Sequence, residues 1–281
     1  MPEIHSLQLQ PIIDRALEED WGNGDWTTDL CVQKGTKAHA SIIAKKPTLA
    51  SCLEIAQAVF FRVDPGLNIK LRAKNGDPVG EKTLLMEIEG EARSILKAER
   101  VALNFLCRMC GVSHMTSRYV AKLKGFKAKL LDTRKTSPGL RLLEKWATSI
   151  GGARNHRLCL TDGVLVKENH IRAAGSITNA VNRLLESLPP TLKIEVEAST
   201  LDEVHEALDA GADLILLDNM SISEMKLAVR TVRGRVLLEA SGNITLDNIA
   251  DVAETGVDFI SSSAIIHSAP WADLSLLFTV P

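Results

Sequence analysis

Short apolar segments alternate with amphipathic helical segments over the second half of the chain. Runs of this kind are typical of strands buried on both faces, and they fall at Ala128–Asp132, Val164–Lys167, Ile194–Glu197, Leu214–Asp218, Val236–Glu239 and Phe259–Ser261. The later runs are separated by helical segments that each end near a glycine, namely Leu201–Ala210 before Gly211, Ser223–Val232 before Gly234, and Leu246–Thr255 before Gly256. Repeated strand–helix units predict a parallel sheet with right-handed crossovers, and so many units in series favour a barrel.

The first hundred residues have a different pattern, which predicts a small domain of mixed helices and strands. Its expected elements are a helix at Leu9–Glu19, strands at Ala38–Ala44, Asn68–Ala73 and Thr83–Glu89, and a helix at Leu53–Val63. The sequence Asn75-Gly76-Asp77-Pro78 is a turn signal between two of these strands. Apolar residues at helical spacings then predict one long helix from Ser94 to about Lys122.

Polar residues follow each apolar run of the second half. In a barrel of parallel strands the carboxyl ends of all strands meet at one mouth, where active sites are built. A single polar residue after a strand is more often a turn former or a helix N-cap. Six such ends in series favour a binding site, and they are Asp132-Thr133-Arg134-Lys135, Lys167-Glu168-Asn169-His170, Glu197, Asp218-Asn219, Glu239 to Asn243, and Ser261-Ser262-Ser263.

The charge of the chain is unevenly distributed around this predicted mouth. The whole chain of 281 residues has a net charge of −2, but Asp132–Arg172 has eight basic and four acidic side chains, a balance of +4. Lys193–Asp258 has five basic and fourteen acidic side chains, a balance of −9. One side of the mouth should therefore attract anions, and the other should offer carboxylates.

Composition excludes several classes of protein. An apolar fraction of 45% and a charged fraction of 24% are ordinary for a globular protein, and only 6 Phe, 4 Trp and 1 Tyr argue against a surface that stacks nucleic-acid bases. No apolar run reaches the ~20 residues of a membrane helix, and Met1–Gln10 does not resemble a signal peptide. Five cysteines indicate reduced thiols, and the Cys107/Cys110 pair lacks a second pair for a zinc site. We therefore expect a cytoplasmic protein that binds neither membrane nor nucleic acid.

The residues at the mouth suggest a small ligand with several negative charges. Arg134, Lys135 and Lys167 directly follow strands, and with His156 and Arg157 they suit carboxylates or phosphates. The other basic residues of this segment, Arg141, Lys145, Arg154 and Arg172, are better explained as solvated surface charges. Glu197 and Asp218 are suited to Mg²⁺ or sugar hydroxyls, although a carboxylate pair for glycoside hydrolysis is a competing use. The segments Ser241-Gly242-Asn243 and Ser261-Ser262-Ser263 could hold a phosphate on backbone N–H groups and hydroxyls.

Several motifs resemble those of the quinolinate phosphoribosyltransferase family, whose members are also called carboxylating nicotinate-nucleotide pyrophosphorylases. The resemblance extends in order from Glu99 to His267, and the Trp21–Leu30 stretch is also similar. The motifs are Asp132 to Arg141 (DTRKTSPGLR), Gly151 to Arg157 (GGARNHR), Lys167-Glu168-Asn169-His170, Glu195-Val196-Glu197, Leu217-Asp218-Asn219 and Glu239-Ala240-Ser241-Gly242.

This resemblance implies an α/β fold with an N-terminal α/β sandwich domain and an open, incomplete α/β barrel. We place the first domain at residues 1–110 and the barrel at 111–268, with a tail at 269–281 that packs back on the first domain. The implied subunits form a homodimer or a higher oligomer. The implied reaction joins quinolinate to phosphoribosyl pyrophosphate and releases pyrophosphate and CO₂, leaving nicotinate mononucleotide for NAD synthesis.

The resemblance also implies a role for each candidate residue. Quinolinate would be held by Arg134, Lys135, His156, Arg157 and Lys167, with Arg100 donated from the partner subunit. Phosphoribosyl pyrophosphate would be held by Glu197, Asp218, Ser241, Gly242, Asn243, Ser261, Ser262 and Ser263. Lys135, Glu197 and Asp218 would act in catalysis, and Glu197 and Asp218 would bind the cofactor Mg²⁺, partly through water.

The chain departs from the family pattern at two places. After the last strand it has Ile260-Ser261-Ser262-Ser263-Ala264, where the family has Ile-Ser-x-Gly-Ala. A side chain at Ser263 could either crowd a phosphate or add a hydroxyl donor. Met109-Cys110-Gly111 stands where Ser-Gly is expected, which should affect only the packing of the helix.

Three alternatives remain open at this stage. Homologues associated with molybdenum transport share the barrel and part of the Arg-Lys-Thr motif but lack a lysine equivalent to Lys167, and the presence of Lys167 here favours quinolinate as the substrate. A barrel aldolase would form a Schiff base on Lys135 or Lys167, and borohydride trapping with a keto substrate would reveal it. A protein that binds nucleic acid through the basic segment Arg134–Arg172 would show salt-dependent binding without turnover.

Overall fold

The computed structural model describes residues 5–280 and divides the chain into two compact units. The first unit contains the residues up to Ser117, the segment Ser137–Gly151 and the residues from Ala269 onward. The second contains Arg118–Thr136 and Gly152–Ser268. These units group residues differently from the domains predicted at 1–110 and 111–268, whose boundaries stay a prediction.

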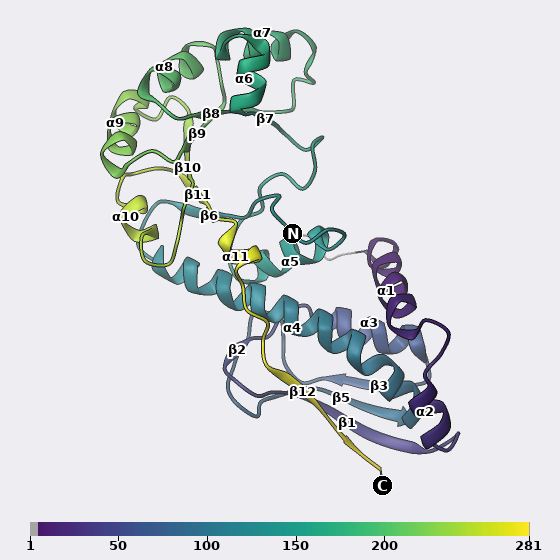
Figure 1. The fold of residues 1–281 in the computed structure, drawn as a ribbon. Helices are drawn as coiled ribbons and strands as arrows, with labels where there is room; N and C mark the ends of the chain where they lie inside the picture. Colours follow the sequence, from purple (N-terminus) through teal and green to yellow (C-terminus); the bar gives the residue numbers. More distant parts are fainter. Residues whose placement is uncertain (1–4, 281) are drawn as a thin grey trace. The chain divides into compact units, whose positions relative to one another are not determined.

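The first unit is built on a four-stranded antiparallel sheet in the order β12-β1-β5-β3. Strands β1 (Lys37–Ala44), β3 (Asn68–Leu71) and β5 (Leu84–Glu91) agree closely with the predicted strands. The fourth, β12 (Leu274–Thr279), comes from the far end of the chain and pairs with β1 from Ala44↔Leu274 to His39↔Thr279 (Figure 1). Strand β1 alternates buried and less buried residues, so that Ala38, Ala40, Ile42 and Ala44 lie in the core.

The first unit also contains five helices within the described residues, which pack through their apolar faces. The helices of the first unit are α1 (Ser6–Trp21), α2 (Trp26–Cys31), α3 (Leu53–Val63) and α5 (Arg141–Ile150), together with most of α4 (Ala92–Lys122). Helix α3 buries Leu53, Ile55, Ala56, Val59 and Phe60. Two short strands, β2 (Thr48–Leu49) and β4 (Pro78–Val79), form a separate antiparallel pair that the sequence pattern does not predict.

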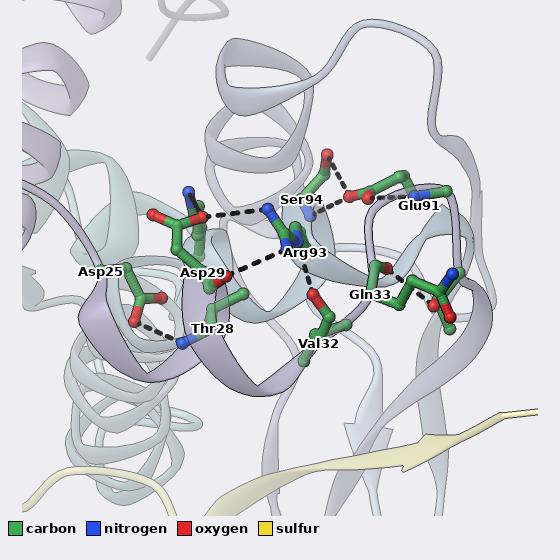
Figure 2. A network of polar contacts seen from close by, with 11 residues as sticks. Asp25, Thr28, Asp29, Val32, Gln33, Glu91, Arg93 and Ser94 are labelled. Atoms are coloured by element: carbon green, nitrogen blue, oxygen red, sulfur yellow. Dashed lines mark hydrogen bonds and ion pairs between the residues drawn. The ribbon is translucent and has the colours of Figure 1, made fainter.

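A network of polar contacts joins the short helix α2 to the start of α4 (Figure 2). Asp25 caps α2 by accepting the Thr28 N–H at 2.9 Å, and hydrogen bonding from the Thr28 side chain and then from its backbone lowers the pKa of the Asp25 carboxyl. Arg93 of α4 donates from Nε to the Val32 carbonyl at 2.7 Å and from Nη2 to the Asp29 carbonyl at 3.0 Å. The guanidinium thus satisfies carbonyl groups at the end of α2 that have no partner within so short a helix.

The second unit is a six-stranded parallel sheet in the order β6-β11-β10-β9-β8-β7. Its strands are β6 (Lys129–Leu131), β7 (Val164–Val166), β8 (Ile194–Ala198), β9 (Leu214–Asp218), β10 (Leu237–Ser241) and β11 (Phe259–Ser261). Within residues 5–280, β6 and β7 are the two edges and do not pair with each other. The open α/β barrel that the sequence predicts is therefore confirmed, and each predicted strand is present within two residues of its expected ends.

Helices follow the strands of this unit, and most of them lie along the outer side of the sheet (Figure 1). They are α6 (Glu168–Ala174), α7 (Ile177–Ser187), α8 (Leu201–Asp209), α9 (Ile222–Val232), α10 (Ile249–Ala253) and α11 (Ala264–His267). Helix α10 is shorter than the predicted Leu246–Thr255. Its first residues instead form a turn in which the Thr245 N–H donates to Asn248 Oδ1 at 2.8 Å, a side-chain bond that competes with helix formation.

No helix in the described part of the chain is both long and apolar enough to cross a membrane.

Candidate functional site

The candidate residues of the second unit gather at the carboxyl edge of its parallel sheet. Lys135 follows β6 and Lys167 directly follows β7, while Glu197, Asp218, Ser241 and Ser261 lie at the ends of β8, β9, β10 and β11. Because all six strands run in the same direction, these ends share one edge of the sheet. The predicted convergence of polar strand ends is therefore present in the structure.

A cavity of about 620 Å³ lies at this edge. Candidate residues that line it are Lys135, Asp218, Ser241, Gly242, Asn243, Ser261, Ser262 and Ser263. Hydroxyl, amide and backbone groups dominate this lining, a set of donors that suits phosphate and sugar oxygens. Other candidates of the same unit do not line the cavity: Arg134, Lys167 and Glu197 lie at or after the ends of β6, β7 and β8, and His156 and Arg157 lie in the loop before β7.

The turn after β10 has a backbone that only glycine allows. Gly242 has φ +100°, and a Cβ atom there would lie 2.2 Å from Asn219 Oδ1. That oxygen accepts a hydrogen bond from Asn243 Nδ2 at 3.1 Å, while Asn219 Nδ2 donates to Asp218 Oδ2 at 3.0 Å. The turns after β9 and β10 are thus held against each other, and Asp218 is fixed where it lines the cavity.

Ser263 stands where the family pattern has glycine, and its backbone does not need one. Its φ is −78°, which any residue adopts. The Ser263 hydroxyl lies 3.0 Å from Nε2 of His267, and the other ring nitrogen lies 2.8 Å from the Ser268 hydroxyl. All three side chains line the cavity, so Ser263 orients a histidine there.

A second group of candidates is anchored on Asp132, the buried residue that follows β6. Its carboxylate accepts a hydrogen bond from Asn155 Nδ2 at 2.6 Å and another from the His156 N–H at 2.9 Å. Arg157 next donates from Nη1 to the Gly163 carbonyl at 2.9 Å. Burial and the nearby charge of Arg134 lower the pKa of Arg157, and Glu195 opposes that shift. The charges of Arg134 and Arg157 therefore act on each other, and two such neighbouring charges favour a bound anion.

His156 and two buried acids form a group that we call the His156/Glu195/Glu239 cluster. His156 Nε2 lies 2.9 Å from Glu195 Oε2 and 3.8 Å from Glu239 Oε2. Glu239 is 1% exposed, and burial together with the charge of Glu195 raises its pKa to about 8. Glu239 is therefore mostly protonated at neutral pH.

Lys167 and Glu197 form an ion pair across β7 and β8, with Nζ 3.0 Å from Oε2. Glu197 is mostly buried and Lys167 is half exposed, so the pair presents the lysine to solvent. Carboxylate oxygens at Glu197 and Asp218 are the donors that Mg²⁺ prefers, which makes the predicted ligands chemically suitable. Of residues 5–280, however, the one group of three or more potential metal ligands is the His156/Glu195/Glu239 cluster.

Arg100 is the candidate that lies outside this unit. It lies on α4 in the first unit, and its side chain is exposed.

The sequence alone does not identify Thr245, His267 and Ser268 as cavity residues, nor Asp132, Glu195 and Glu239 as a buried framework. Asn219 and Asn243 have a left-handed backbone that only the structure reveals. A signal for the acids does exist, because Glu195 lies between the apolar residues Ile194 and Val196 of β8, where an unpaired carboxylate is strongly disfavoured.

Comparison with known proteins decides the family. The model of the quinolinate phosphoribosyl transferase N-terminal domain matches residues 25–110, and that of the C-terminal domain matches residues 112–277. The chain belongs to the quinolinate phosphoribosyltransferase family. A probable carboxylating nicotinate-nucleotide pyrophosphorylase of Synechocystis is 44% identical over 272 residues, covering 95% of this chain and 92% of the relative. The chloroplastic enzyme of Oryza sativa is 40% identical over 98% of this chain and 79% of its own length.

Solved structures of this family also share the whole fold. The nicotinate-nucleotide pyrophosphorylase of Francisella tularensis has a TM-score of 0.94 and 38% identity, covering 99% of this chain and 98% of its own. The corresponding protein of Ehrlichia chaffeensis has a TM-score of 0.94 and 38% identity, covering 99% of this chain and 100% of its own. The family resemblance stated from the motifs is thus confirmed over nearly the full chain.

Proposed function

We propose that this protein transfers the phosphoribosyl group of phosphoribosyl pyrophosphate to quinolinate and releases pyrophosphate and CO₂, forming nicotinate mononucleotide for NAD synthesis. The observation that carries the proposal is the pairing of a hydroxyl- and amide-lined cavity with a cationic wall on the same sheet edge. Family membership supplies the reaction, and the names of the relatives state it for those proteins.

The cationic side chains suit the dicarboxylate. Quinolinate has two adjacent carboxylates, and Arg134, Arg157 and Lys167 offer positively charged groups that can bind them. His156 lies next to these cationic side chains, because its ring nitrogen Nδ1 accepts the backbone N–H of Arg157. Lys135 lines the cavity beside these residues, where its ammonium can meet the anions of both substrates.

The cavity suits the phosphoribosyl donor. Ser241, Gly242 and Asn243 line one part of it, and Ser261, Ser262 and Ser263 line another. Backbone N–H groups and hydroxyls of this kind bind phosphate oxygens. Glu197 and Asp218 would hold Mg²⁺, which would supply positive charge to neutralise the leaving pyrophosphate.

The proposed reaction depends on positive charge that develops first on the ribose and then on the ring nitrogen of quinolinate. The ring nitrogen of quinolinate forms a bond to the ribose carbon as the bond to pyrophosphate breaks, through a ribose with oxocarbenium character. Carboxylates at Glu197 and Asp218 stabilise that positive charge. The ribosylated ring nitrogen is cationic, so it stabilises the electron pair left on the ring carbon when CO₂ departs, and a proton then takes the place of CO₂. No covalent enzyme intermediate is required.

We also infer a homodimer in the cytoplasm, with Arg100 reaching the partner's site. The exposed Arg100 supports this arrangement, as do the exposed apolar side chains of Trp26 and Leu30 on α2, at 77% and 76%. Five free cysteines in the described chain fit a reducing compartment.

The test is CO₂ release from carboxyl-labelled quinolinate in the presence of phosphoribosyl pyrophosphate and Mg²⁺. The wild-type protein should release CO₂ only when all three are present, and Lys167→Ala should lose most of this activity. If borohydride treatment instead attached a keto substrate covalently to the protein, that result would support an aldolase that forms a Schiff base on a lysine. A folded wild-type protein that releases no CO₂ would refute the proposal.

A further inference from the structure

The His156/Glu195/Glu239 cluster contains more buried polar groups than its hydrogen bonds account for. Glu195 is 5% exposed and Glu239 is 1% exposed, and one oxygen of each, Glu195 Oε1 and Glu239 Oε2, has no hydrogen-bond partner in the described chain. The nitrogen Nε2 of His156 and one oxygen of each acid all lie within 4.8 Å of one another. Two ionised carboxylates this close and this buried would repel strongly, so the cluster must hold a cation or a proton.

The hydrogen bonds of His156 decide between a metal and a proton. Its Nδ1 accepts the N–H of Arg157 at 2.8 Å, so Nδ1 has a lone pair and no hydrogen. In a neutral imidazole the other nitrogen, Nε2, is then the protonated one, and it donates to Glu195 Oε2 at 2.9 Å. A metal on Nε2 would need that hydrogen removed as well, which leaves an imidazolate. The geometry therefore favours a proton on the acids.

The same hydrogen bonds connect the buried acids to the candidate substrate ligand Arg157. Glu195 accepts from the ring of His156, and that ring accepts the backbone N–H of Arg157. Asp132 holds the backbone N–H of His156 from the other side. The residue before Arg157 is thus fixed both at its backbone and at its side chain, and the orientation of Arg157 follows from it.

We infer that Glu195, which lies against the buried Glu239, is a positioning residue: its carboxylate accepts from Nε2 of His156 and holds that ring as the neutral Nε2–H tautomer, which fixes the backbone of Arg157 for substrate. The inference rests on the proposed function for its substrate, quinolinate, but not for the state of the cluster. Glu239 acts as the neutral, protonated partner, and Glu195 is the hydrogen-bond acceptor.

Substitutions at the two acids separate their roles. Glu239→Gln keeps the shape of a protonated carboxyl, so KM for quinolinate and kcat should stay within about twofold. Glu195→Met removes the acceptor for His156, so KM for quinolinate should rise about tenfold, the usual effect of losing one charge-assisted hydrogen bond, while KM for phosphoribosyl pyrophosphate stays within about twofold. Glu195→Gln restores an accepting oxygen and should return KM to within about threefold of wild type.

The sign of the KM change distinguishes positioning from simple electrostatics. Removal of a negative charge near an anion site by itself strengthens anion binding, so a rise in KM reports lost orientation. Glu186→Met, the same exchange at an exposed position of α7, is the matched control and should leave both KM values unchanged. A Glu239→Gln variant as impaired as Glu195→Met, or a Glu195→Gln variant with no recovery, would overturn the assignment.

The tautomer is measured without any turnover. In the full-length protein with ¹⁵N-labelled histidine, the His156 ring should show a non-protonated Nδ1 and a protonated Nε2 at neutral pH, with His156→Asn used to assign its signals among the seven histidines. Signals of an imidazolium or of the Nδ1–H tautomer would overturn the inference, as would stoichiometric Zn²⁺ uptake that Glu195→Gln and Glu239→Gln both abolish. A protein that shows the expected tautomer but releases no CO₂ would refute the proposed function and leave the cluster assignment standing.

Discussion

Single residues at the sheet edge determine how the cavity presents its polar groups. Ser263 shows this most clearly, because its backbone tolerates any side chain while its hydroxyl lies 3.0 Å from His267 Nε2. Of the two possibilities that the sequence leaves open, the structure favours a serine that orients a cavity histidine.

Ser263→Ala should therefore raise KM for phosphoribosyl pyrophosphate about two- to tenfold, the range for one neutral hydrogen bond, and leave KM for quinolinate unchanged. Steady-state kinetics with each substrate varied in turn measures this. If Ser263→Gly binds the donor more tightly than wild type, the side chain crowds the phosphate instead.

Glu239 should make the stability of the fold depend on pH. Its pKa is about 8 in the folded state, against an ordinary value of 4.5, because it is buried and lies near Glu195; His156 and the Ser261 hydroxyl oppose the shift. The folded state keeps this proton while the unfolded state loses it, so stability falls as pH rises from about 4.5 to about 8, by at most about 1.4 kcal/mol per pH unit.

Glu239→Gln removes that titration. Urea unfolding of both proteins between pH 5 and pH 8 should show a shallower loss of stability in the variant. Parallel curves for the two proteins would mean that Glu239 is ionised in the folded state.

At the level of elements, the packing of α4 depends on one glycine. A Cβ atom at Gly111 would lie 2.1 Å from the carbonyl oxygen of Pro270 and 3.2 Å from the Ala272 nitrogen. Ala272 in turn donates its N–H to the Cys107 carbonyl at 2.9 Å. The segment that leads into β12 therefore lies directly against the backbone of α4, and the Met109-Cys110-Gly111 sequence keeps the glycine this contact needs.

Gly111→Ala should destabilise the protein by about 1–3 kcal/mol, the usual effect of overpacking, although alanine favours helices elsewhere. Chemical denaturation measures the change. Gly80→Ala is the control, because a Cβ there meets nothing closer than 4.0 Å and the backbone is unstrained, so its stability should stay within about 0.5 kcal/mol of wild type.

For the whole molecule, the proposed dimer predicts that two inactive variants complement each other. If Arg100 acts in the partner's site, then a mixed dimer of Arg100→Ala and Lys167→Ala has both defects in the same copy of the site, and the other copy is intact. Mixing the two inactive proteins under conditions of subunit exchange should restore up to about one quarter of wild-type activity, since about half of the random dimers are mixed and one of their two sites is intact. Proven exchange without recovery would place Arg100 in the site of its own subunit.

The sequence predicts the strands of the barrel well because strands buried on both faces are continuous apolar runs with punctuating glycines. Their shared edge follows from the parallel direction, which places Asp218, Ser241 and Ser261 together. The pairing of His156 with Glu195 and Glu239 depends on contacts across three separate segments, which no local pattern contains. The strand β12 is missed for a related reason, because its partner is at the other end of the chain.

Because β1 pairs with β12, the sheet of the first unit cannot be completed until β12 has been translated. The Thr279 hydroxyl donates to the His39 carbonyl across 240 residues of sequence, so a ribosome making about 5–20 residues per second exposes β1 for roughly 10–50 seconds before its neighbour exists. During that interval one side of β1 can only bond to water, to a chaperone or to the wrong strand. Strand β1 is thus translated early but gains its second neighbour late. The yield of folded protein in the cell should therefore depend on how well this unpaired edge of the nascent chain is protected.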